Sequence, residues 1–221
     1  MRFRDLLTAD MPDHFIMPEE FLTLADWIEK KKYLEAWRDS ETGQDVVTGY
    51  LIDPETQSDY NVSHVYLQAG DTEVMNWTES DRLHPLGGTG SDGSYFHLWI
   101  DDEGNQQVVH TGSGSGSLLT ATFPSALSVL RLFAVGYPDP CMQDDWADPP
   151  EDQYEFDRED KKLSKSSLRP YRKWLRKTWR QKTPRNGVEA LNLTAEEGQA
   201  WIDNDGPPDD PFGRWLDSVL N

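Results

Sequence analysis

The sequence predicts an α+β protein in which one domain is followed by a helical extension. Three observations favour this class: a helical pattern near the N-terminus, a group of short β-rich segments in the middle, and helical patterns rich in charge after about residue 160. With 221 residues, 36% of them hydrophobic and nine of them Trp, the chain can bury a sizeable core. We expect a domain over residues 1–138 and an extension over 139–221 that packs on it.

The first predicted element is a helix over residues 18–39. Pro18 and two glutamates open it, Phe21, Leu24 and Ile28 follow at helical spacing, and the pattern ends before Gly43. Three short segments rich in β-formers then predict strands, at residues 46–53, 64–68 and 73–77.

The next element is a hairpin over residues 95–110, YFHLWIDDEGNQQVVH, in which two β-rich runs flank a polar turn. If the turn centres on Glu103 and Gly104, His97 and His110 face each other across the strands, whereas a turn at Gly104 and Asn105 breaks that pairing. A metal would need a further ligand, for example His84 or Asp92. The five histidines lack the short paired spacings of metal sites, so we expect no metal or other cofactor.

The remaining elements are helices. Pro124 opens one that Gly136 and Pro138 end, and residues 166–182 form a basic helix. Between them, the segment from 138 to 160 is rich in Asp, Glu and Pro, which indicates a domain boundary or a long ordered loop. Thr194 and Glu197 form the pattern of a capping box, and Asp210 is typical of the cap of a short terminal helix.

A glycine motif, GGTGSDG at residues 87–93, has the G-x-G-x-x-G spacing of nucleotide-binding loops. A dinucleotide-binding loop is followed by a helix, but a predicted strand follows this motif. A kinase-like phosphate loop requires a lysine on a following strand, and no lysine occurs from Tyr33 to Asp160. We therefore interpret these residues as a turn. No catalytic signature accompanies it, since Cys141 lies in an acidic stretch that disfavours a thiolate, and we expect a protein that is not an enzyme.

Charge is distributed unevenly along the chain. Residues 158–185 carry 12 basic and two acidic residues, a net charge of +10. Because the net charge of the whole chain is −19, the other residues together carry −29. Two interpretations of this basic block remain open. It docks on the acidic body through an apolar stripe of Leu168, Tyr171 and Leu175, or it binds nucleic acid through phosphate contacts and base stacking by Tyr171, Trp174 and Trp179. We favour docking.

The acidic segment 139–160 also has two interpretations. Its carboxylates around Trp146, Tyr154 and Phe156 suit an anionic partner surface with aromatic anchors. Alternatively, the segment is a solvated connector whose aromatic side chains attach it to the core. The single cysteine, the absence of a signal-peptide pattern and the absence of any apolar run of membrane-spanning length favour a cytoplasmic protein without a membrane partner.

Residues 84–138 resemble the central segment of the SUKH superfamily, which includes fungal cell-wall regulators linked to killer-toxin resistance and bacterial immunity proteins. The matched order is the glycine-rich turn, the strand ending in LWI, the polar hairpin, the strand VVH, a glycine-rich loop, and FPSALSVLRLFAVG as a helix. The loop 111–117 departs from the family, since it contains only Gly, Ser and Thr. The resemblance implies a single twisted, largely antiparallel sheet packed against helices, and a non-catalytic protein that neutralises a toxin, often a nuclease.

Together, these observations lead to the hypothesis of an immunity protein that blocks a cationic toxin. The residues expected to bind the partner are Asp144, Asp145, Trp146, Asp148, Glu151, Asp152 and Tyr154, with Asp101, Asp102 and Glu103 of the hairpin turn as a secondary patch. The alternatives are a regulatory or scaffold protein of the same fold, and a nucleic-acid-binding protein that uses residues 161–185.

Overall fold

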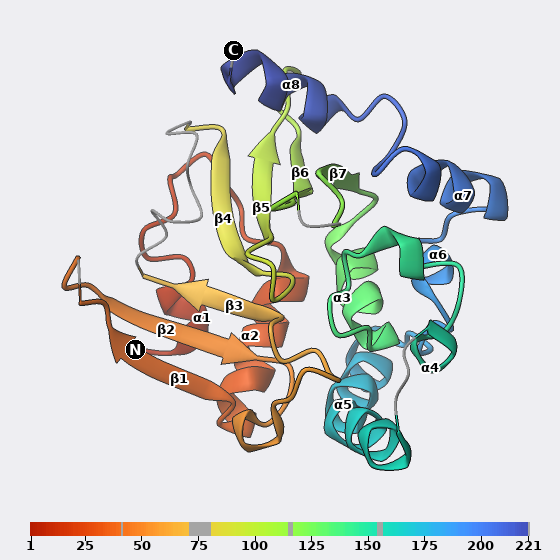
Figure 1. Cartoon of the computed structure of the whole chain (residues 1–221). Helices are drawn as coiled ribbons and strands as arrows, with labels where there is room; N and C mark the ends of the chain where they lie inside the picture. The colour runs from red at the N-terminus through yellow and green to blue at the C-terminus, as the bar shows by residue number, and fades with distance from the viewer. Residues whose placement is uncertain (41, 71–80, 115–116, 154–156, 221) are drawn as a thin grey trace.

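A computed structural model describes the chain except for residues 41, 71–80, 115–116, 154–156 and 221. The predicted strand at 73–77 thus lies outside the described residues. Two antiparallel sheets lie side by side, with helices behind them and along one side (Figure 1). One sheet has the order β1-β2-β3 and the other β4-β5-β6-β7. The strands are β1 Leu34–Arg38, β2 Asp45–Tyr50, β3 Tyr66–Ala69, β4 Leu83–Gly88, β5 Tyr95–Ile100, β6 Gln106–Thr111 and β7 Thr120–Phe123.

The α+β class and the antiparallel pairing are confirmed, but the strands form two hydrogen-bonded sheets where the resemblance implied one. The division falls between β3 and β4, which are neighbours without a ladder of hydrogen bonds. β4 contains Pro85, which has no N–H to donate, and its register shifts between Pro85 and Gly87. At Gly87 the backbones come so close that a Cβ would lie 1.8 Å from the Tyr66 carbonyl oxygen.

The N-terminal helices are α1, Phe3–Leu6, and α2, Glu19–Lys31. The predicted helix over 18–39 was too long, because Lys32 adopts a left-handed conformation with φ of 62° and ends α2. Leu34–Arg38 then form β1 at the edge of the first sheet.

The hairpin of β5 and β6 is confirmed, with a register that neither sequence-based alternative anticipated. Ile100 pairs with Gln106, which centres the turn on Glu103. His97 therefore pairs with Val109 and His110 with Phe96, so the two histidines lie on opposite faces of the sheet. The cross-strand histidine pair that a turn at Glu103 and Gly104 would produce does not form.

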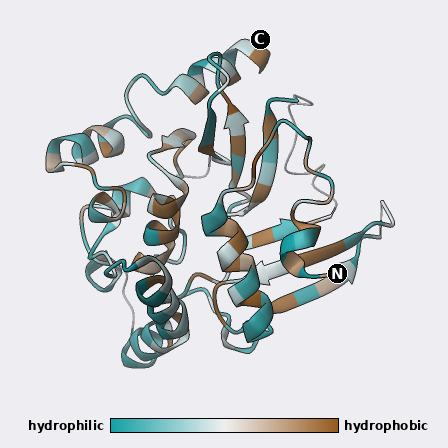
Figure 2. Cartoon of the chain, turned by 180° about the vertical axis from the view of Figure 1, so that it is seen from behind, coloured by the Kyte–Doolittle hydropathy of each residue, from teal (hydrophilic) through white to brown (hydrophobic). Residues whose placement is uncertain are grey.

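The central helix α3, Ala126–Val135, begins at the cap residue Ser125 and ends at Gly136. The basic helix α5, Arg158–Trp179, packs against it and is largely hydrophilic on its outer side (Figure 2). The basic helix predicted over residues 166–182 is present, but it begins at Arg158 and ends at Trp179. The other short elements are η1 Pro54–Thr56, η3 Gln143–Asp145, α4 Pro150–Gln153, α6 Gly187–Ala190, α7 Ala195–Asp203 and α8 Pro211–Leu220.

The extension shares the core of the domain. One hydrophobic cluster runs from Phe3 and Phe21 through α3 to Leu175 and Trp201. A second cluster joins Trp99 to the underside of α8. The predicted caps are confirmed: Thr194 and Glu197 form a capping box, and Asp210 accepts the N–H of Gly213 at the start of α8.

Candidate functional site

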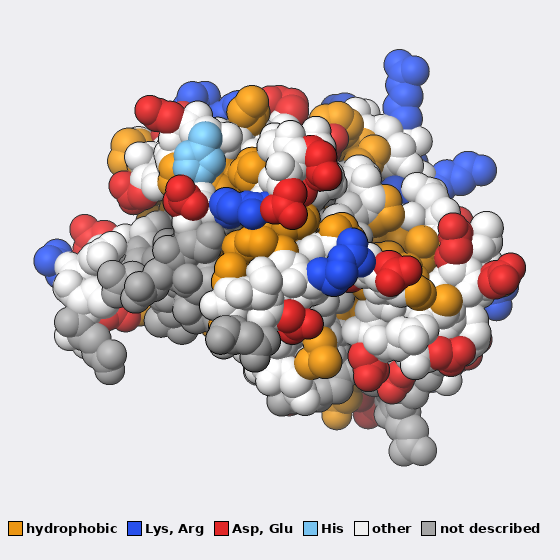
Figure 3. Space-filling model, turned by 90° about the horizontal axis from the view of Figure 1, so that it is seen from above, with side chains coloured by type: hydrophobic (Ala, Val, Ile, Leu, Met, Phe, Trp, Pro, Cys, Tyr) orange, Lys and Arg blue, Asp and Glu red, His pale blue; other side chains and the backbone are white. Residues whose placement is uncertain are grey.

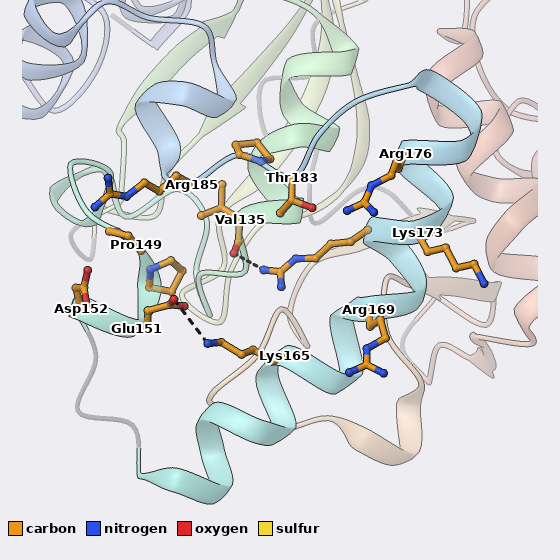
Figure 4. Close-up of a pocket in the computed structure, with 13 residues that line it drawn as sticks. Val135, Pro149, Glu151, Asp152, Lys165, Arg169, Lys173, Arg176, Thr183 and Arg185 are labelled. Carbon is orange, nitrogen blue, oxygen red and sulfur yellow. Dashed lines mark hydrogen bonds and ion pairs between the residues drawn. The ribbon is translucent and has the colours of Figure 1, made fainter.

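A cleft of about 810 Å³ lies between α5, α4, the segment 183–185 and the end of α3 (Figure 4). It brings together the basic helix and the acidic segment, which the sequence predicts as two separate surfaces. The described residues that line it include six cations and two carboxylates. These are Lys165, Arg169, Arg172, Lys173, Arg176 and Arg185, with Glu151 and Asp152.

The orientation of α5 follows from its apolar stripe. Leu168, Tyr171, Trp174 and Leu175 are buried, and the Tyr171 hydroxyl donates a hydrogen bond of 2.8 Å to the Leu130 carbonyl of α3. Trp174 packs on Trp27 of α2, with ring centroids 5.6 Å apart. The prediction that the helix docks through this stripe is confirmed. Base stacking by Tyr171 and Trp174 is excluded, because both rings are buried in the protein.

Charge plays a smaller part in this docking than we expected. Among the residues that the structure describes, α5 forms one ion pair, between Lys165 Nζ and Glu151 Oε1 at 3.7 Å. Arg169, Lys173 and Arg176 are exposed. The helix thus attaches by burial of apolar area, and its cations remain toward solvent.

Arg172 forms the floor of the cleft. Its Nε donates to the Ala134 carbonyl at 2.8 Å and its Nη2 to the Val135 carbonyl at 2.6 Å, which satisfies free carbonyls at the end of α3. Burial lowers the pKa of Arg172 below its ordinary value, while the charge of Glu151 acts in the opposite direction. Because arginine titrates far above neutral pH, the guanidinium stays charged and rigidly placed.

Around this floor, the exposed side chains point in different directions (Figure 4). Lys165 extends toward Glu151, and Arg176 extends toward Thr183 on the opposite wall. Lys173 turns away from the cleft. The guanidinium groups of Arg172 and Arg176 therefore provide hydrogen-bond donors on the α5 side of an open cleft.

The predicted acidic surface is only partly assembled. Asp144, Asp148, Glu151 and Asp152 are exposed, the last two at the cleft. Asp145 lies in η3, and its side chain is outside the described part of the structure, as is all of Tyr154.

Trp146 is not an exposed anchor, which corrects the prediction. It is completely buried, its indole N–H donates to the Pro140 carbonyl at 2.7 Å, and its ring packs against Trp201. The alternative interpretation holds for this residue, because Trp146 attaches the acidic segment to the core.

The secondary patch, at the hairpin turn, lies near α8 in Figure 1, whereas the helices α4 and α5 that line the cleft lie at the opposite end of the molecule. Asp101 accepts the backbone N–H groups of Glu103 and Asn105 at 3.0 and 2.7 Å and so shapes the turn. Asp102 pairs with Arg82 at 2.9 Å, and the Arg82 guanidinium lies over the rings of Trp99 and Trp215. Viewed from this end, carboxylates are spread over the surface (Figure 3).

The first two glycines of the motif, Gly87 and Gly88, end β4, and the residues after them form the predicted turn. Asp92 Oδ2 accepts hydrogen bonds from the hydroxyls of Ser94, at 2.7 Å, and Ser113, at 3.0 Å. This carboxylate therefore links the turn before β5 to the glycine-rich loop after β6.

Several groups suited to acid–base or nucleophilic chemistry are buried. Burial lowers the pKa of His97 to about 3 and that of His110 to about 4, so both are neutral at pH 7. Burial also raises the pKa of the Cys141 thiol, which disfavours the thiolate. Within the described ranges, no group of three or more His, Cys, Asp or Glu side chains is placed to hold a metal ion.

The sequence groups all six cations within residues 161–185, where we considered a nucleic-acid surface, but it does not place them in one cleft with Glu151 and Asp152. A signal was present, because Lys165, Arg169, Arg172 and Arg176 are spaced by four, three and four residues and so share one face of a helix. Arg185 could not be found in this way, since it comes from the loop after α5.

Comparison with known proteins identifies no relative: no family model matches the chain, and no curated protein and no solved structure is significantly similar to it. In the part of the chain that the structure describes, no helix combines the length and the apolar character needed to cross a membrane.

Proposed function

We propose that the protein is a non-catalytic immunity protein of the SUKH type, which binds a cationic protein toxin in the cytoplasm and blocks its active surface. The resemblance of residues 84–138 to that superfamily is one support. The burial of His97, His110 and Cys141 is another, because a binding protein requires no accessible acid, base or nucleophile.

The observation that carries the proposal is the attachment of the acidic segment by Trp146. The buried indole fixes the backbone of this segment, while Asp144 and Asp148 on either side of it are exposed. Carboxylates on a fixed backbone lose less conformational freedom on binding than those on a mobile loop. The net charge of −19 also speeds the approach of a cationic toxin.

The test is co-expression with the toxin candidate encoded by the neighbouring gene. We expect the chain to restore growth and to form a stoichiometric complex with the purified toxin. The double variant Asp144→Lys/Asp152→Lys should weaken that complex at least tenfold, about 1.4 kcal/mol. Isothermal titration calorimetry measures the difference.

The matched control is Asp10→Lys/Asp13→Lys, which changes the net charge equally at two exposed residues before α2. It should change the dissociation constant less than about threefold, as expected for charges outside the interface. Absence of both rescue and complex, or an equal loss in the two double variants, would overturn the proposal.

A further inference from the structure

We infer that the cleft between α4 and α5 binds a small ligand that carries two or more phosphate groups. This inference goes beyond toxin neutralisation and does not depend on it. It starts from the balance of charge in the cleft: with Lys173 turned away, five cations and two carboxylates line it, an excess of three positive charges in a strongly acidic protein. Among the described residues, only Lys165 of these five is in an ion pair.

The geometry suits phosphate because the cations include arginines held on a rigid frame. A guanidinium presents parallel N–H donors that match two phosphate oxygens, and an arginine fixed in advance loses little entropy on binding. Arg172 is fixed by its two bonds to the end of α3. Arg169 and Arg176 lie on the same helix, and Arg185 lies on the opposite wall.

The size of the cleft and its surroundings favour a small ligand over a nucleic acid. About 810 Å³ is within the usual range of small-molecule sites. A nucleic acid would find Tyr171 and Trp174 buried rather than available for stacking, and the chain outside residues 158–185 repels it with a net charge of −29. An excess of about three charges also matches a di- or triphosphate better than a single phosphate.

The experiment uses inorganic tripolyphosphate as the probe, titrated into the full chain at constant ionic strength. We expect saturable binding with one ligand per chain. The variant Arg169→Gln/Arg176→Gln should weaken it at least tenfold, whereas Lys162→Gln/Lys177→Gln should change it less than threefold. Lys162 and Lys177 are exposed on the same helix but do not line the cleft, so both variants lose the same charge.

A third variant changes the affinity in the opposite direction. Glu151→Gln removes a carboxylate from the cleft and releases Lys165, so it should bind tripolyphosphate more tightly than the wild-type chain. Loss of Glu151 cannot strengthen the attraction of a cationic toxin. The two proposals therefore predict different effects at this residue, and either can fail without the other.

Two further probes at the same ionic strength decide the ligand class: a single-stranded oligonucleotide and an oligo-glutamate peptide. Weaker binding of both than of tripolyphosphate supports a small phosphate ligand. Tighter binding of either, equal weakening in the two double variants, or no saturable binding of tripolyphosphate would overturn the inference. Circular dichroism and thermal unfolding of each variant confirm that the comparison is between folded proteins.

Discussion

Gly187 lies so close to the indole of Trp146 that a Cβ at this position would be 2.3 Å from Cγ of the ring. The replacement Gly187→Ala must therefore displace a fully buried tryptophan, although alanine is ordinarily the better helix former. We expect the free energy of unfolding to fall by about 2 kcal/mol in urea denaturation. Gly104→Ala is the comparison, because nothing lies within 4 Å of a Cβ there. Because Gly104 has a positive φ of 82°, alanine there should lower the free energy of unfolding by only about 1 kcal/mol. An equal loss of stability in the two variants would contradict the steric explanation.

Stability should fall in mild acid because His97 and His110 remain neutral in the folded protein. Their pKa values of about 3 and about 4 lie below the ordinary value of 6.5 that they regain on unfolding. Between pH 6.5 and about 4 the unfolded chain therefore binds more protons, and the free energy of unfolding decreases as the pH falls. The free energy of unfolding should fall by up to about 1.4 kcal/mol per pH unit for each histidine in this range. Above pH 7 the two histidines no longer make the stability depend on pH.

Urea denaturation at a series of pH values measures this slope, and His97→Gln tests its origin. His97 Nε2 lies 2.8 Å from the Thr111 hydroxyl, a contact that glutamine can in part replace. The variant should be less stable at pH 7 but should lose less stability on acidification. An unchanged slope would exclude His97 as its source.

Asp210 links the C-terminal helix to the sheet. Its Oδ1 accepts the backbone N–H and the hydroxyl of Thr122, at 3.1 and 2.6 Å, while Oδ2 accepts the N–H of Gly213. Asp210→Ala removes all three bonds, and we expect a loss of about 2 kcal/mol. Hydrogen exchange should show faster exchange in residues 211–220 than elsewhere. A uniform change across the chain would contradict a local attachment.

Cys141 should be unreactive in the native protein. The thiol is buried, and burial raises its pKa, so neither access nor ionisation favours attack on a disulfide reagent. We expect no modification by dithiobis(nitrobenzoate) at pH 8 over a time in which the urea-unfolded chain reacts completely. Reaction of the folded chain at a rate typical of a free thiol would show that this region opens readily.

Elements governed by local chemistry were predictable from the sequence. The hairpin, the central helix and the caps at Thr194 and Asp210 each depend on residues close together in the chain. The predicted end of the N-terminal helix and the predicted hairpin register were wrong, because the local signals there were ambiguous. Lys32 ends α2 in a left-handed conformation that a lysine rarely adopts, so nothing in the pattern announced it. The turn register depends on Asp101, whose side chain accepts two backbone N–H groups and stabilises an odd-numbered loop.

The candidate site was less predictable because it is made by tertiary packing. The basic and acidic segments could each be recognised by charge, but their convergence at one cleft depends on how α5 docks on α3. Trp146 illustrates the same difficulty, since an aromatic residue among carboxylates suits an interface anchor and a core anchor equally well. Its burial is decided by Trp201 and Gly187, which are more than 40 residues away in the chain.

The outward-facing cations of α5 also make the molecule an electric dipole, with a positive side on an otherwise negative body. In the field of a charged partner such a molecule experiences a torque, and it turns before contact within a distance of about 8–10 Å at physiological salt. A cationic body would be met by the carboxylate-rich sides, and an anion by the α5 side. Orientation during the encounter is thus a property of the whole molecule and is not confined to the residues that finally touch.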